Sequence, residues 1–193
     1  DEEADRLDAL IQDSLDLARI QARQENPRVE ECTIDSVVSG VLDKMKRYLA
    51  RHTIIVSVPD DLPVVRGDRF LFEQMIGQIL DNAWKYAAAG SRVWIAGWQE
   101  NAEIILTIRN EGPQIPEEER TAIFDRFYRG ERSRASVEGT GLGLAIAKTI
   151  AEVHGGRVWL QAAEEGPEFC FALPAGPIGK GPENDREPYY IAD

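Results

Sequence analysis

The chain of 193 residues has few cysteines, few histidines and no long apolar run. Its two cysteines, Cys32 and Cys170, lack the spacing of a metal site or of a disulfide framework, which favours a reducing, cytoplasmic setting. No apolar segment approaches the length of a membrane span, and no signal peptide is visible. The first residues, DEEADRLDAL, lack a methionine and read as the middle of a helix, so we expect a piece of a longer protein.

Positive charge is also scarce, with 22 lysines and arginines against 34 acidic residues and a net charge of −12. This balance argues against nucleic acid or an anionic membrane as a direct partner. It suits a domain whose basic residues gather locally around an anionic ligand. The length fits one ordinary domain with a real core, and no internal repeat is apparent.

Helical and strand patterns are mixed along the chain without strict alternation. An apolar stripe predicts a helix over 1–24 that packs on a partner helix within or between chains, formed by Leu7, Leu10, Ile11, Leu15, Ala18 and Ala22. Further helices are expected over 35–50 (with Asp35 as cap), 69–87, 117–124 and 143–154, and strands over 32–34, 52–59, 92–98, 103–109, 157–162 and 168–174. Residues 60–68 read as a loop, and the tail 175–193 is expected to be mobile. The pattern predicts an α+β sandwich with one sheet covered by helices on one face.

One helix carries a polar face beside its buried stripe. Gln78, Asn82, Lys85 and Tyr86 recur at helical spacing in GQILDNAWKYA. A carboxamide such as that of Asn82 can ligate magnesium, and Lys85 can neutralise phosphate. Most such faces are only solvated, so this pattern alone leaves both interpretations open.

A glycine-rich turn opens another helix, in EGTGLGLAIAKTI over residues 138–150. Such turns bind anions because their amides point outward and the helix dipole favours negative charge, although a flexible turn is the simpler alternative. Two further stretches lie between these motifs, NEGPQIP over 110–116 and FDRFY over 124–128. The second could equally be core packing.

These four stretches, in this order, resemble the ATP-binding catalytic domain of sensor histidine kinases, in the wider family that includes gyrase, Hsp90 and MutL. LDNAWKYA is similar to the asparagine box, NEGPQIP to the first glycine box, FDRFYRG to the phenylalanine box and GTGLGLAIAKTIAEVHGG to the second glycine box. The resemblance covers about residues 32–173 and implies a two-layer α/β sandwich with a mixed sheet. It divides the chain into part of a dimerisation domain (1–24), a connector (25–31), an ATP-binding domain (32–174) and a tail (175–193).

The resemblance also implies roles for individual residues. Asn82 would bind Mg²⁺, Lys85 would contact phosphate, Tyr86 would lie near the adenine, and Gln78 and Lys85 would serve catalysis. Arg132 and Arg134, on the loop before the glycines, would reach the γ-phosphate. The remaining implied nucleotide contacts are Asn110, Gly112, Ile115, Phe127, Gly139, Thr140, Gly141, Leu142 and Gly143.

Three positions depart from the family pattern. Gln78 replaces a usual Asn, Asn110 replaces the Asp that accepts from the adenine amino group, and Gln114 replaces a glycine. A carboxamide oxygen can still accept that hydrogen bond, at a loss of about 1–2 kcal/mol in charge assistance. Gln114 is expected to add bulk beside the pocket.

The implied activity is transfer of the ATP γ-phosphoryl to a histidine, for relay to the aspartate of a response regulator. Neither His52 nor His154 stands in the family's phosphoacceptor context, so both are expected to be structural and the acceptor to lie outside this chain. The intact protein is expected to be a homodimer that binds no nucleic acid, with no direct membrane contact by this part. The alternatives are a non-catalytic, nucleotide-responsive interaction module and a serine kinase of the anti-sigma type, against which the helix over 1–24 argues.

Overall fold

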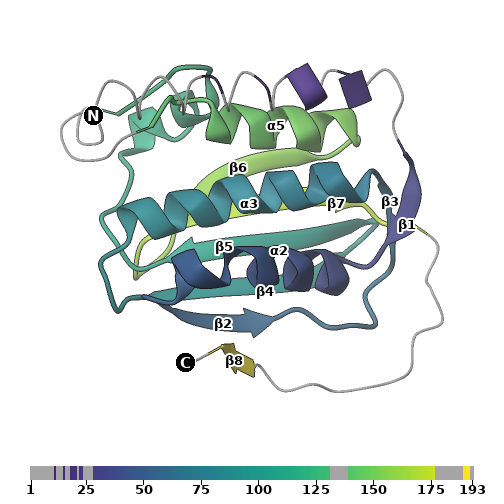
Figure 1. The fold of residues 1–193 in the computed structure, drawn as a ribbon, viewed down its shortest axis with the longest axis horizontal. Helices are drawn as coiled ribbons and strands as arrows, with labels where there is room; N and C mark the ends of the chain where they lie inside the picture. Colours follow the sequence, from purple (N-terminus) through teal and green to yellow (C-terminus); the bar gives the residue numbers. More distant parts are fainter. Residues whose placement is uncertain are drawn as a thin grey trace.

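Three helices lie on one face of a sheet in the computed structural model (Figure 1). It describes residues 28–130 and 139–176, positions 11, 15, 18–20, 22 and 23 nearer the N-terminus, and the backbone of 189–191. The helices are α2 (Ile34–Leu49), α3 (Arg69–Tyr86) and α5 (Gly143–Val153). The expected architecture, a sandwich with helices on one face of the sheet, is confirmed.

The main sheet has the strand order β6-β7-β5-β4-β2-β8. Its strands are β2 (Thr53–Ser57), β4 (Arg92–Glu100), β5 (Glu103–Asn110), β6 (Arg157–Ala162), β7 (Pro167–Pro174) and β8 (Tyr189–Ile191). The pairing of β2 with β4 is parallel and the other pairings are antiparallel, so the sheet is mixed. A separate antiparallel pair joins β1 (Glu30–Cys32) to β3 (Val65–Gly67).

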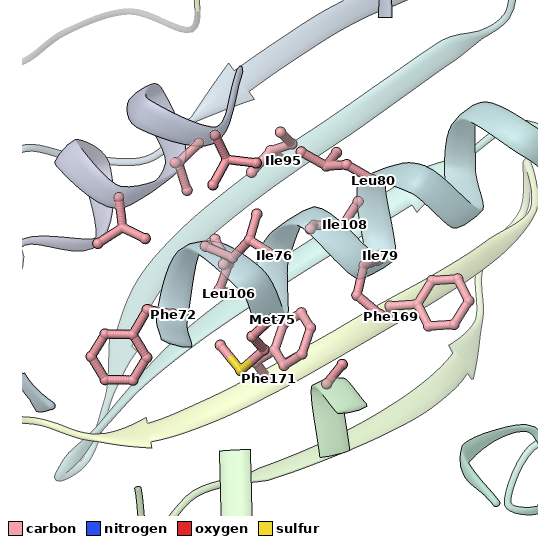
Figure 2. Close-up of a cluster of buried hydrophobic side chains, with 14 of the residues drawn as sticks. Phe72, Met75, Ile76, Ile79, Leu80, Ile95, Leu106, Ile108, Phe169 and Phe171 are labelled. Carbon is pink, nitrogen blue, oxygen red and sulfur yellow. The ribbon is translucent and has the colours of Figure 1, made fainter. Parts of the chain in front are cut away.

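The core lies between α3 and the inner face of the sheet, as Figure 2 shows. Seven residues of α3 are buried, at the spacing that a helix needs to face one side. The labelled residues of α3 are Phe72, Met75, Ile76, Ile79 and Leu80, and those of the sheet are Ile95, Leu106, Ile108, Phe169 and Phe171. Burial of these apolar surfaces fixes which face of α3 turns away from the sheet.

Several predicted boundaries were wrong. Helix α2 begins at Ile34 with Thr33 at the N-cap position, so Asp35 lies in the first turn and is not the cap. The predicted helix over 117–124 is two short 3₁₀ turns, η1 (Glu117–Glu119) and η2 (Ala122–Phe124). The stretch 60–68, predicted to be a loop, contains β3, whose pairing partner lies more than thirty residues earlier. At the other end of the chain, β8 pairs with β2, although residues 175–193 were expected to form a mobile tail.

The described N-terminal helical residues 11, 15, 18–20, 22 and 23, here called the N-terminal segment, present two different faces. Ile11 and Leu15 of the predicted stripe are 51% and 47% exposed. Ile20, which lies off that stripe, is only 2% exposed and belongs to the main core. The segment therefore packs on the rest of the chain through Ile20 and leaves Ile11 and Leu15 of the stripe exposed.

Candidate functional site

The polar face of α3 runs beside the core and carries four of the predicted site residues. Asp68 caps the helix by accepting a hydrogen bond from the Phe70 amide at 3.0 Å. Gln78 and Tyr86 are eight residues apart, which corresponds to roughly 12 Å along a helix axis. Tyr86 is 39% exposed, and Gln78, Asn82 and Lys85 are half-buried. This face can therefore contact an elongated ligand along its length.

Asn110 lies at one end of this polar face of α3, because successive side chains of β5 alternate in direction. Ile104, Leu106 and Ile108 point into the core, and Asn110 continues the same parity at the last position of the strand. It is 3% exposed, and its Nδ2 donates to the Glu111 carbonyl at 3.2 Å. This bond occupies the amide nitrogen and leaves Oδ1 as the acceptor, as a residue that reads an amino group requires.

Gly112 joins Asn110 to the end of α3. A Cβ added at Gly112 would lie 3.2 Å from Asn110 Nδ2 and 3.7 Å from the Tyr86 carbonyl oxygen. Asn110, Gly112 and Tyr86 are thus neighbours. Ile115, further along the same loop, packs against the core.

The β6–β7 turn is hydrogen-bonded to this loop, a contact that the sequence did not reveal. The Gly112 amide donates to the Glu165 carbonyl at 3.1 Å, and the Gln114 side-chain amide donates to the Ala163 carbonyl. Gly166 lies so close to the Asn110 carbonyl that a side chain there would collide with it. The side chain of Gln114 is therefore engaged with the turn, and the expectation that it adds bulk beside the pocket stays a prediction. The glycine in EEGPE was the sequence feature that could have indicated this close approach of the turn to the loop.

The opposite end of the face meets the start of α5. A Cβ added at Gly143 would lie 2.5 Å from Gln78 Oε1, so the two residues are in contact. No side chain of the described residues caps α5, and the Leu142 amide donates to Thr140 Oγ1 at 3.3 Å. An uncapped helix start with a small residue at its first position suits an anion.

Gly141 fixes the approach to that helix start. Its φ is +74°, a conformation that side chains disfavour, and a Cβ there would lie 2.7 Å from the Tyr128 carbonyl oxygen. Its own carbonyl accepts from the Phe127 amide at 2.9 Å, and Phe127 is 66% exposed. A Cβ added at Gly139, in contrast, would meet no atom of the described residues within 4 Å. The phenylalanine box and the second glycine box are therefore bonded to each other.

Lys85 and Asn82 lie between the two ends. Lys85 forms an ion pair with Asp81 at 2.6 Å, with its side chain 32% exposed. The Asn82 side chain has no hydrogen-bond partner within the described part of the chain, although its backbone belongs to α3. Arg132 and Arg134, predicted to contact the γ-phosphate, lie outside the described residues.

The side chains suit a magnesium ion that is shared with a ligand rather than held by protein alone. Among the described residues, no three His, Cys, Asp or Glu side chains gather into a metal site. Mg²⁺ commonly uses one or two protein ligands together with phosphates and water. The unpartnered carboxamide of Asn82 fits such a role.

Both histidines are occupied by structural contacts. His52 is 8% exposed, its Nδ1 lies 3.1 Å from Ser91 Oγ, and burial lowers its pKa. His154 Nε2 accepts from the Asp68 amide at 3.2 Å, so its Nδ1 carries the proton that reaches the Ile150 carbonyl at 2.7 Å. Both nitrogens of His154 are therefore bonded, and the His52 ring is buried.

The chain matches the model of a known protein family. The model of the histidine kinase-, DNA gyrase B- and HSP90-like ATPases matches residues 67–177, more than half of the chain. The chain belongs to this family. The predicted family is thereby confirmed, and ATP is the nucleotide that the family's description names; Mg²⁺ stays a prediction.

Relatives of this ATPase-family chain are sensor kinases. Sensor protein KdpD of Clostridium acetobutylicum is 34% identical over 175 residues, which cover 90% of this chain and 19% of the relative. Sensor-like histidine kinase SenX3 of Mycobacterium bovis is 32% identical over 196 residues, covering 96% of this chain and 47% of the relative. The chain thus spans less than half the length of these two curated relatives. The solved structure of the mycobacterial sensor histidine kinase MprB is 29% identical, with a TM-score of 0.68, and covers 79% of this chain and 99% of its own.

No helix of the described residues is both long and apolar enough to span a membrane.

Proposed function

We propose that this chain is the ATP-binding, phosphoryl-donating part of a sensor histidine kinase. One observation carries the proposal: α3 joins two different half-sites along one polar face. Asn110 and Gly112 lie beside Tyr86 at one end, and Gly143 of the second glycine box lies against Gln78 at the other. The two ends of the face, at Gln78 and Tyr86, are roughly 12 Å apart, a distance that suits a nucleotide extending from a base to its phosphates.

The base would bind at the Asn110 end. Asn110 Oδ1 would accept from the adenine amino group, since its Nδ2 is already bonded to the Glu111 carbonyl. Tyr86, Gly112 and Ile115 would surround the base, with Phe127 nearby. Guanine offers a carbonyl where adenine offers an amine, so this acceptor would favour ATP over GTP.

The phosphates would bind at the start of α5, along Gly139, Thr140, Gly141, Leu142 and Gly143. Asn82 would hold the magnesium ion, which would neutralise charge on the phosphates. Lys85 would exchange its ion pair with Asp81 for a phosphate oxygen, and Gln78 would support catalysis beside Gly143. Arg132 and Arg134 are proposed to reach the γ-phosphate.

The reaction would be an in-line transfer from ATP to a histidine outside this chain. The bond between the γ-phosphorus and its bridging oxygen breaks, a bond to the histidine nitrogen forms, and ADP leaves with the bridging oxygen. Catalysis of this kind relies on positioning and charge neutralisation. The histidine would then pass the phosphoryl group to the aspartate of a response regulator.

The exposed stripe of the N-terminal segment supports a homodimer of the intact protein. Ile11 and Leu15 are uncovered in this single chain, as a helix that packs on a second copy would be. We assign residues 1–24 to the dimerisation part, 25–31 to the connector, 32–174 to the ATP-binding domain and 175–193 to the tail. A cytoplasmic location follows from the same proposal, with no contact to nucleic acid or membrane by this part.

The test uses a longer protein that includes the residues preceding this chain. Incubation with ATP labelled in the γ-position is expected to give an acid-labile, base-stable label on a histidine of the added residues. Asn82→Ala is expected to remove this label while leaving the fold intact by circular dichroism. Full labelling of the Asn82→Ala protein, or no labelling of the wild type, would contradict the proposal.

A further inference from the structure

Asp68 connects parts of the molecule that are far apart in the sequence. Its side chain is buried, with 1% of the residue exposed. The Nη1 atom of Arg23 donates to its two oxygens at 2.6 and 2.7 Å, and the Arg28 amide donates at 3.2 Å. The same carboxylate caps α3 through the Phe70 amide. One side chain therefore joins the N-terminal segment to the start of α3.

The backbone of Asp68 reaches a third element. Its amide donates to His154 Nε2 at 3.2 Å, and His154 is the residue at which α5 ends. The His154 ring also packs on Phe72 of α3, with ring centroids 4.5 Å apart. We call this set of contacts, made by Asp68 with Arg23, Arg28, Phe70 and His154, the Asp68 junction.

The junction lies at the far end of both helices that form the nucleotide half-sites. Helices α3 and α5 lie side by side (Figure 1) and run in opposite directions, because the start of α3 meets the end of α5. Further along, Gln78 of α3 meets Gly143, the first residue of α5. A change at the junction would therefore act on both helices at once, because packed helices tend to shift as rigid bodies.

The described contacts of the N-terminal segment with the junction and the core come from Arg23 and Ile20. The Arg23 guanidinium lies 4.4 Å from the centroid of the Phe70 ring, and Ile20 is buried in the main core. The opposite face, with Ile11 and Leu15, is exposed. If the segment moves, the buried carboxylate of Asp68 loses its counter-charge, a state that strongly favours rearrangement.

We propose that Asp68 is a positioning residue for the nucleotide site and that Arg23 makes its action depend on the N-terminal segment. The proposal rests on the proposed ATP-binding function. With Arg23 in place, the carboxylate stays at the start of α3 and the Asp68 amide stays on His154, so the spacing of Gln78 and Gly143 is kept. Displacement of the segment loosens that spacing, and the segment thereby controls the affinity for nucleotide.

The first experiment measures whether the ion pair holds the segment. Amide hydrogen exchange of peptides covering residues 11–23 is compared among the wild type, Arg23→Ala, Asp68→Asn and Arg28→Ala. Asparagine is as good a helix cap as aspartate, so Asp68→Asn removes the charge and retains the cap. Arg28→Ala removes a nearby positive charge but retains the backbone amide that bonds to Asp68, and it serves as the matched control.

Exchange in the segment is expected to rise about tenfold in Arg23→Ala and in Asp68→Asn. The double variant should exceed the larger single effect only slightly, because both changes remove one interaction. Arg23→Lys should be intermediate, and Arg28→Ala should match the wild type. Unchanged exchange in Arg23→Ala, an equal rise in Arg28→Ala, or fully additive effects in the double variant would overturn the proposal.

The second experiment measures whether the junction acts on the nucleotide site. Titration calorimetry with ATP and Mg²⁺ should show a three- to tenfold weaker affinity for Arg23→Ala and Asp68→Asn, with an intermediate value for Arg23→Lys. Saturating ATP should slow exchange in the wild-type segment by the same factor, because coupling between two sites is reciprocal. Raised exchange with unchanged ATP affinity would overturn the positioning role and leave the ATP proposal intact. Absence of ATP binding by the wild type would overturn both, and the exchange data would still report whether the ion pair holds the segment.

Discussion

Replacement of Gly141 by alanine tests how the second glycine box is built. Gly141 has a φ of +74°, and left-handed backbone costs a residue with a Cβ roughly 1–2 kcal/mol. The new Cβ would also lie 2.7 Å from the Tyr128 carbonyl oxygen, well inside the roughly 3.5 Å of a normal non-bonded contact. Relief of that contact requires a backbone shift, worth about 1–2 kcal/mol more. The total is about 3 kcal/mol.

This strain can appear in two measurements. If the loop stays in place, the free energy of unfolding in urea falls by about 3 kcal/mol. If the loop moves to relieve the contact, stability is retained and ATP affinity falls more than tenfold, because the amides of the glycine turn no longer face the phosphates. Urea unfolding and calorimetry are therefore performed on the same variant.

Gly139→Ala is the matched control, two residues away in the same motif. A Cβ at Gly139 meets no atom of the described residues within 4 Å and its φ is not positive, so both measurements should stay within about 0.5 kcal/mol of the wild type. Equal behaviour of the two variants would contradict a specific steric role for Gly141, because the glycines would then serve only general flexibility.

Four further outcomes are expected. Asn110→Asp should tighten ATP binding by somewhat less than tenfold without improving the binding of GTP, which calorimetry measures. The free energy of unfolding should fall by about 1–2 kcal/mol in urea, because the buried side chain loses its hydrogen bond to the Glu111 carbonyl. Burial acts to raise the pKa of Asp68, but bonds from Arg23 and the Arg28 amide outweigh it and hold the pKa below the usual range. Its contribution to stability is therefore present above about pH 4 and lost as the pH falls further, and acid titration of Asp68→Asn should show a shallower loss. Burial raises the pKa of Cys170 to about 12 and also raises that of Cys32, so a thiol reagent at pH 8 should label the native chain only as fast as it unfolds. Labelled ATP should leave His52 and His154 of this chain unmodified in peptide mapping, since His52 is buried and both nitrogens of His154 are bonded.

The sequence predicted the parts of the site that lie on single regular elements. The apolar period of α3 determined that Asn82 and Tyr86 share the face beside the core, and the alternation of β5 predicted its strand through Arg109. Local rules suffice there, because burial of one face dictates the direction of the other. Asn110 itself came from the family motif, and the structure explains its inward direction by the parity of the same strand.

The remaining features depend on contacts between distant residues. Arg23 and Asp68 are 45 residues apart, and the Gln114 side chain reaches a turn 49 residues later. The helix cap at Asp68 could have been read from a polar residue before an apolar period, but the arginine that neutralises it could not. Strand β3 was missed for the same reason, since three residues acquire strand character only from their pairing with β1.

Calorimetric titration of this chain with ATP, in the presence and absence of Mg²⁺, measures whether the polar face of α3 and the glycine turn form a nucleotide site. We expect ATP to bind, Mg²⁺ to tighten binding, and Asn82→Ala to remove the contribution of Mg²⁺ while retaining the magnesium-free affinity. An intact fold that binds no ATP, or an Asn82→Ala variant with the same affinities as the wild type under both conditions, would contradict this expectation.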